Sequence, residues 1–186
     1  MPIFNEKTCI IWDTEYTCWK GCNEHGWDRS RGRFRELIQI ALLKLVAKNF
    51  TVVDKLEIFV KPKLNFQLSE YCKKLTNIKQ ESIDNAEPFS IVLKKLKIFI
   101  KDYNVYAFGK DYEVLKENLK INKLKNPFKN KFYNLKPFFI EKGINIEGYT
   151  SGTMCEYFNK TSKYHTHDAL GDVLSLVVAL KELKKL

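Results

Sequence analysis

Residues 9–19 read CIIWDTEYTCW, an apolar run that leads into two acids separated by one residue. The stretch from Thr8 to Asp13 is short and apolar, which predicts a buried strand. Because alternate residues of a strand share one face, Asp13 and Glu15 should point the same way. Two convergent carboxylates can hold a hard divalent cation; the alternative is a solvated strand end.

A second pair of candidate residues lies near the other end of the chain, in YHTHDALGDVLSL (residues 164–176). Apolar residues at helical spacing from His167 onward predict a final helix, and Asp172 borders its apolar face. A partly buried acid needs a cation or hydrogen-bond donors, so Asp172 could complete a metal site. His167 could then take a proton from a metal-bound water. The alternative is a surface histidine beside a helix cap at Thr166 or Asp168.

The segments between these pairs predict a single mixed α/β domain over residues 1–186. Glycine and arginine in residues 20–35 favour a loop. Three early strands without helices between them indicate an antiparallel meander, and helices alternate with strands after it. The expected strands cover residues 36–46, 52–60, 105–108 and 132–133, and the expected helices cover residues 69–74, 88–100, 111–119, 151–158 and the chain from residue 167.

The charge balance favours a polyanionic partner. Lysine and arginine number 32 against 22 acids, a formal net charge of +10. Such a surplus is typical of nucleic-acid-binding proteins, although a lysine-rich soluble surface is the alternative. No apolar run approaches the ~20 residues of a membrane span, so no membrane partner is expected. The start of the chain lacks a signal-peptide pattern, and five cysteines form no paired set, which predicts a cytoplasmic protein with reduced thiols.

These motifs together resemble the DEDDh family of 3′→5′ exonucleases, and most closely its Eri-like exoribonuclease branch. The segments FRELIQIALLKL (residues 34–45) and FVKPKLNFQLSEYCKKLTNIKQESIDNAEPF (residues 59–89) are similar to that branch as well. The likeness runs from Cys9 to about Leu180, and it implies a ribonuclease-H-like fold. That fold has antiparallel strands 1–3 followed by parallel strands, flanked by helices. The motif residues are Asp13, Glu15, Thr17, Cys18, Trp19, His167 and Asp172.

The middle acid of the family pattern is displaced by one residue. Relatives usually place it three residues after a glycine, whereas Asp111 follows Gly109 by two in VYAFGKDYEVL (residues 105–115). A turn shortened by one residue would still bring Asp111 to the start of a helix. Glu113 and Asp102 are the alternatives, and Asp111 could instead serve only as a helix cap.

The resemblance implies hydrolysis with two Mg²⁺ or Mn²⁺ ions, and carboxylate ligands favour these ions over Zn²⁺. Asp13 would bridge both ions, Glu15 and Asp172 would bind the water-activating ion, and Asp111 would bind the second. His167 would be the general base, for which its ordinary pKa of about 6.5 is suitable. A free 3′ end would enter, and nucleoside 5′-monophosphates would leave.

Aromatic and basic residues near the motifs are candidates for substrate contacts. Residues 14–17 would grip the 3′-terminal nucleotide, as the resemblance implies. Alternating arginines at positions 29, 31, 33 and 35 could follow a phosphate backbone, or they could belong to a solvated loop. The predicted substrate-binding residues are Thr14, Tyr16, Thr17, Trp19, Arg33 and Phe108.

Cys18, Cys22 and His25 have a spacing that could suit part of a zinc site, the alternative being buried thiols. The leading interpretation of the chain is a metal-dependent exonuclease acting on RNA with a single-stranded 3′ end. A DNA-trimming or proofreading-type exonuclease is one rival. A nucleic-acid-binding module without turnover is another, and the shortened middle motif is its only support.

Overall fold

The computed structural model describes residues 4–128 and 132–185. In these residues six strands form one sheet, in the order β4-β3-β2-β1-β5-β6. The strands are β1 (Thr8–Tyr16), β2 (Leu37–Val46), β3 (Thr51–Lys61), β4 (Glu87–Pro88), β5 (Val105–Ala107) and β6 (Phe132–Asn134). The helices are α1 (Cys22–His25), α2 (Glu70–Thr76), α3 (Gln80–Asp84), α4 (Phe89–Ile100), α5 (Asp111–Ile121), α6 (Lys136–Glu141) and α7 (Ala169–Leu183), with 3₁₀ helices η1 (Arg29–Arg31) and η2 (Met154–Phe158).

The mixed sheet predicted from the sequence is confirmed. Strands β1, β2 and β3 pair in antiparallel fashion, with Asp13 opposite Ala41 and Glu15 opposite Gln39. Strand β5 then joins the other side of β1 in parallel, and β6 joins β5 in parallel. The two-residue strand β4 also pairs in parallel with β3, a pairing too short for the sequence pattern to indicate.

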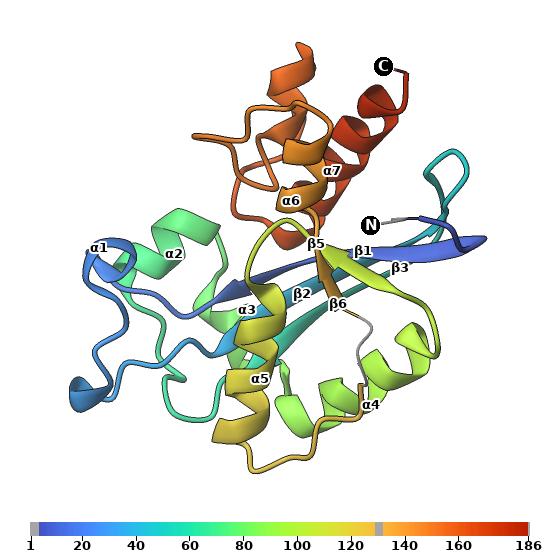
Figure 1. Ribbon diagram of the computed structural model, residues 1–186. Helices are drawn as coiled ribbons and strands as arrows, with labels where there is room; N and C mark the ends of the chain where they lie inside the picture. The colour runs from blue at the N-terminus through green and yellow to red at the C-terminus, as the bar shows by residue number, and fades with distance from the viewer. Residues whose placement is uncertain (1–3, 129–131, 186) are drawn as a thin grey trace.

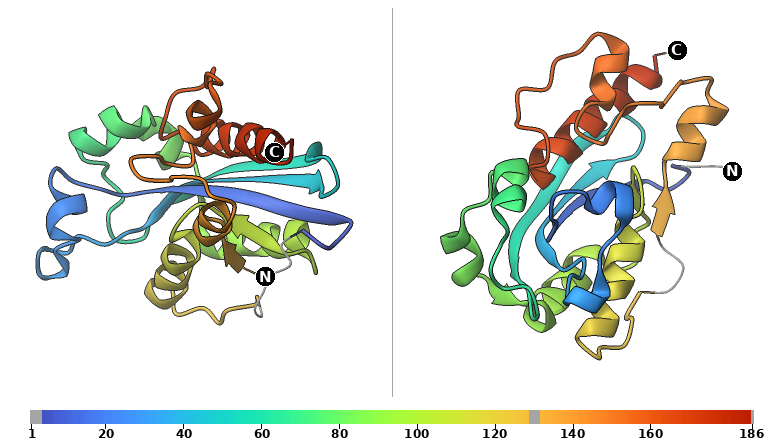
Figure 2. Two further views of the ribbon diagram at one scale, coloured as in Figure 1. Left: turned by 45° about the horizontal axis from the view of Figure 1, so that its top comes forward. Right: turned by 90° about the vertical axis from the view of Figure 1, so that its left-hand side faces the viewer.

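Helices cover both faces of the sheet, α7 on one face and α4 with α5 on the other (Figures 1 and 2). Alternation along β1 supplies both interfaces, because successive side chains of a strand point to opposite faces. Cys9 and Ile11 pack in the cluster that contains α7, whereas Ile10 and Trp12 pack in the cluster that contains α4 and α5. By this alternation Asp13 and Glu15 lie on the α7 face, as predicted.

Several segments differ from the predicted elements. Residues 20–35 contain α1 and η1 rather than a continuous loop. Residues 151–158 form a 3₁₀ helix only from Met154, and the final helix begins at Ala169 because His167 has a left-handed backbone with φ 65°. Neither α3 nor α6 was predicted, although the proline near the start of α6 is a usual signal for a first helical turn. In the described residues, no helix is both long and apolar enough to span a membrane.

Candidate active site

A pocket of about 220 Å³ lies where the ends of β1 and β5 meet the starts of α5 and α7. The five side chains predicted to do chemistry all line it: Asp13, Glu15, Asp111, His167 and Asp172. They come from three segments separated by about a hundred and then fifty residues of sequence. The structure therefore brings together every acid of the predicted set and its histidine.

Ligand atoms of Glu15, His167 and Asp172 lie within 4.8 Å of one another. The Oδ1 atom of Asp172 is buried and has no hydrogen-bond partner among the described residues. A buried carboxylate oxygen without a donor is costly, and a divalent cation held by these groups would compensate it. The donors are oxygens and one imidazole nitrogen, a set suited to Mg²⁺ or Mn²⁺. The residues present thus fit the predicted metal.

Burial dominates the electrostatics of the four acids. It raises the pKa of Asp13 and of Glu15 well above the ordinary values, and the charges of the neighbouring acids raise them further. Burial likewise raises the pKa of Asp111 to about 6 and the pKa of Asp172 to about 7. Without a counter-charge the carboxylates therefore ionise at higher pH than ordinary acids do, and a bound cation would reverse this.

Asp111 occupies the first position of α5 despite the shortened turn before it. The hydroxyl of Thr14 donates a hydrogen bond of 2.8 Å to Asp111 Oδ1. The alternative acids, Glu113 and Asp102, do not line the pocket. Glu113 lies 4.0 Å from Lys116 on α5, and Asp102 lies in the turn after α4. Asp111 is the acid that the fold places beside Asp13 and Glu15.

His167 lies just before α7 in a bend that residues of β2 hold in place. Gln39 is 2% exposed, and its Oε1 accepts a hydrogen bond of 3.1 Å from the backbone N–H of Ala169. Its Nε2 donates a bond of 2.8 Å to Asp168 Oδ1. Asp168 occupies the capping position but makes no side-chain bond to its own helix, so Gln39 provides that bond. Burial lowers the pKa of His167, and the nearby His165 lowers it further.

Ser151 and Gly152 were not predicted as site residues, yet they support the acids from a loop before η2. Ser151 Oγ donates to Asp13 Oδ1 at 2.7 Å and lies 3.4 Å from Asp172 Oδ2. A Cβ atom at Gly152 would lie only 2.2 Å from Asp172 Oδ1, so a larger residue would displace that carboxylate. Contacts of this kind join residues far apart in the chain, and no local pattern reveals them.

Two lysines also line the pocket and were not predicted. Lys110 precedes Asp111 in the turn, and Lys136 begins α6, with its Nζ 5.2 Å from the ring centroid of Phe108. They are the cationic side chains among the described residues that line this pocket. Their charge suits an anionic ligand beside the acids.

The predicted substrate-binding residues divide into two groups. Thr14, Tyr16 and Phe108 line the pocket. Thr17 does not, because its hydroxyl donates to Phe34 O at 2.6 Å and accepts from Glu36 N at 3.0 Å, which fixes the end of β1.

Trp19 and Arg33 are also absent from the active-site pocket. They lie together beside a different pocket, in the segment between β1 and β2. β1 ends at Tyr16, and Trp19 follows in the segment that lines the other pocket. The structure therefore does not support a contact of Trp19 with a terminal nucleotide held among the acids.

The zinc interpretation gains no support. Cys18 and Cys22 are buried in a core cluster with Cys72. In the part of the chain that the structure describes, the group of three clustered ligands contains Glu15, His167 and Asp172 and none of these cysteines. The thiols belong to the packing of α2 against the end of β1.

Comparison with known families agrees with this site. The family model RNase_T, described as Exonuclease, matches residues 10–180. The chain belongs to this family of DEDDh 3′→5′ exonucleases.

Curated relatives resemble part of the chain. The 3′–5′ exonuclease eri1 of Schizosaccharomyces pombe is 35% identical over 102 residues, which cover 53% of this chain and 32% of that protein. The 3′–5′ exoribonuclease 1 of Homo sapiens is 32% identical over 98 residues, 53% of this chain and 26% of that protein. The matches therefore span only a third or less of these two relatives.

The fold matches that of solved exonucleases. The nuclease domain of 3′hExo, described as a DEDDh family member bound to rAMP, superposes with a TM-score of 0.83 at 23% identity. The match covers 97% of this chain and 93% of that domain. Its extent confirms the ribonuclease-H-like arrangement predicted from the sequence.

Proposed function

We propose that this chain removes nucleotides from single-stranded 3′ ends of RNA and releases nucleoside 5′-monophosphates. The observation that carries the proposal is the convergence of Asp13, Glu15, Asp111, His167 and Asp172 in one pocket. The names of the relatives, an exonuclease and an exoribonuclease, support the choice of RNA.

In this proposal the four acids would hold two Mg²⁺ or Mn²⁺ ions. When bound, such ions lower the pKa of water and neutralise charge on the phosphate and the leaving oxygen. Asp13 would contact both ions, Glu15 and Asp172 would hold one, and Asp111 would hold the other. The buried Oδ1 of Asp172, which has no hydrogen-bond partner among the described residues, supports this assignment.

His167 would accept the proton of the attacking water. Its lowered pKa keeps the imidazole neutral near pH 7, as a base requires. Ser151 would orient Asp13 through its hydrogen bond, and Thr14 would orient Asp111 in the same way. Tyr16 and Phe108 would contact the terminal nucleotide, while Lys110 and Lys136, which line the same pocket, would attract the phosphate.

The binding-module alternative loses its support in this structure. It depended on the shortened turn after Gly109, yet Asp111 lies in the pocket and is held by Thr14. A module that only binds nucleic acid has no need of four clustered acids with raised pKa values. Turnover is therefore the better proposal.

The test is product analysis on an RNA labelled at its 5′ end and carrying a single-stranded 3′ tail. We expect a ladder of shortened products with Mg²⁺ or Mn²⁺, no ladder with EDTA, and 5′-monophosphates among the products. The catalytic-site variant Asp13→Asn should give no ladder. A matched DNA strand degraded at the same rate would remove the RNA preference, and binding without any shortening would overturn the proposal.

A further inference from the structure

A second pocket, of about 380 Å³, lies outside the active site in the segment between β1 and β2. Two indole rings and three lysine or arginine side chains line it, against one acid, Asp28. The aromatic and basic lining residues are Trp19, Lys20, His25, Trp27, Arg31 and Arg33. This combination of flat rings and positive charge is typical of grooves that bind single-stranded nucleic acid.

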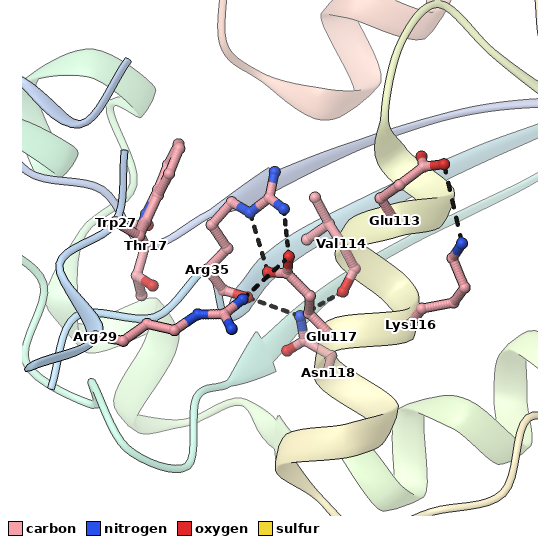
Figure 3. Close-up of polar contacts among 9 residues, drawn as sticks. All are labelled: Thr17, Trp27, Arg29, Arg35, Glu113, Val114, Lys116, Glu117 and Asn118. Carbon is pink, nitrogen blue, oxygen red and sulfur yellow. Dashed lines mark hydrogen bonds and ion pairs between the residues drawn. The ribbon is translucent and has the colours of Figure 1, made fainter. Parts of the chain in front are cut away.

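The arginines near this pocket have different partners. Arg35 makes two hydrogen bonds to Glu117 of α5, one of them 3.0 Å long from Nε, and Arg29 Nη2 lies 3.6 Å from the same carboxylate (Figure 3). These two side chains tie the segment to the helix that begins with Asp111. Their charge is partly neutralised, so they are poor candidates for phosphate contacts.

Arg33 is placed differently. Its guanidinium lies over the ring of Trp19, 5.5 Å from the centroid, much as that of Arg35 lies 5.2 Å from the centroid of Trp27, but no ion pair joins Arg33 to an acid in the described residues. Asp28, the acid of this pocket, pairs instead with Arg31 at 3.2 Å. Arg33 therefore keeps its charge available, with its planar group held against an aromatic ring.

Trp27 links this pocket to the active site. Its indole N–H donates a hydrogen bond of 2.8 Å to Thr17 O, which fixes the ring beside the end of β1 (Figure 3). The ring contacts Tyr16 edge-on, with centroids 5.6 Å apart, and Tyr16 lines the active-site pocket. Each pocket thus has one ring of this aromatic pair in its lining, Tyr16 in the active-site pocket and Trp27 in the second.

We propose that this second pocket binds the RNA strand on the 5′ side of the nucleotide held in the active site. A base would stack on Trp19 or Trp27, and Arg33 would contact a backbone phosphate. The inference rests on the proposed function, because it assigns a place to the rest of the same substrate.

The test compares two RNA substrates with Mg²⁺ present. On this proposal a dinucleotide is too short to span both pockets, whereas a single strand of about 10 nucleotides spans them. We expect Arg33→Gln and Trp19→Leu each to reduce kcat/KM on the longer strand by about tenfold more than on the dinucleotide. For Arg33→Gln, the log–log slope of kcat/KM against salt on the longer strand should become shallower by about 0.7.

Lys97→Gln is the matched control, since it removes one charge from an exposed position on α4, away from both pockets. It should affect neither the ratio of the two substrates nor the salt slope. Equal losses on both substrates in the Arg33 and Trp19 variants would overturn the inference, as would the same loss in the control. No loss on either substrate would overturn it as well, and that would be the result if the pocket served an acidic protein segment. If the wild-type chain degraded neither RNA, the proposed function would fail, and this inference with it.

Discussion

In the first half of β1, from Cys9 to Trp12, the side chains are apolar and fully buried in two core clusters. In the second half the burial is nearly as complete, with Asp13 6% and Glu15 7% exposed, but the side chains are acids. Burial of the apolar half stabilises the fold, whereas burial of the acids without a counter-charge destabilises it. One strand therefore contains a segment that stabilises the sheet and a segment that destabilises it. The destabilising segment, with its buried acids, would be compensated by a bound cation.

The largest effect expected from this comparison is on activity. Asp13→Asn keeps the shape of the side chain but removes a charge from the proposed metal site. We expect RNA hydrolysis to fall by roughly 10²–10³-fold or more, the range seen when one group that stabilises transition-state charge is lost. Single-turnover rates at saturating Mg²⁺ would measure it. A loss of less than tenfold would exclude Asp13 as a ligand of the proposed metal ions.

Substitutions in the apolar half of β1 should lower the stability of the fold, whereas Asp13→Asn should lower the activity. Ile11 is fully buried on the same face as Asp13, so Ile11→Ala removes core contacts and leaves a cavity. We expect it to lower the free energy of unfolding by about 2–5 kcal/mol, and Ile11→Val by about 0.5–1.5 kcal/mol. Urea denaturation with EDTA present would measure both. If the two variants had equal stability, Ile11 would not be closely packed in the core.

The acids that α5 and α7 place beside the acidic half of β1 predict an unusual pH dependence for the metal-free protein. Asp111 and Asp172 have pKa values raised from 3.8 to about 6 and about 7, so between pH 4 and pH 7 the folded state binds protons that the unfolded state does not. Stability is then greatest at the acid end of this window and falls as the pH rises through it, by several kcal/mol. Thermal unfolding in EDTA should show Tm falling from pH 5 to pH 8.

Two additions sharpen this measurement. Saturating Mg²⁺ should restore Tm at pH 8, because it compensates the ionised carboxylates. Asp172→Asn should flatten the fall in EDTA and raise Tm at pH 8, although it abolishes the proposed metal ligand. If Tm of the metal-free protein rose with pH, the pKa values of Asp111 and Asp172 would not be raised in the folded state.

The sequence predicted the parts of this site that have a local pattern. The period-two alternation of β1 placed Asp13 and Glu15 on one face, and the helical spacing after His167 placed Asp172 at the edge of a core. It could not predict Ser151, which reaches Asp13 across 138 positions of sequence, because no periodicity encodes such a contact. The sequence could not predict that Trp19 and Arg33 lie beside a second pocket and not among the acids. The place of these side chains depends on where β1 ends, and composition marks the ends of strands poorly.

The smallest effect concerns the bend that carries His167. Gln39→Leu fills a similar volume but removes the acceptor for Ala169 N and the donor to Asp168. We expect a loss of stability of about 1 kcal/mol, the usual contribution of such bonds, and a fall in kcat of about tenfold with little change in KM. Gln39→Glu retains the acceptor but places a third carboxylate beside Asp168 and Glu57, to both of which Gln39 donates, so it should regain part of kcat only as the pH falls. If both variants lost stability without losing kcat, Gln39 would support the helix and not the orientation of the base.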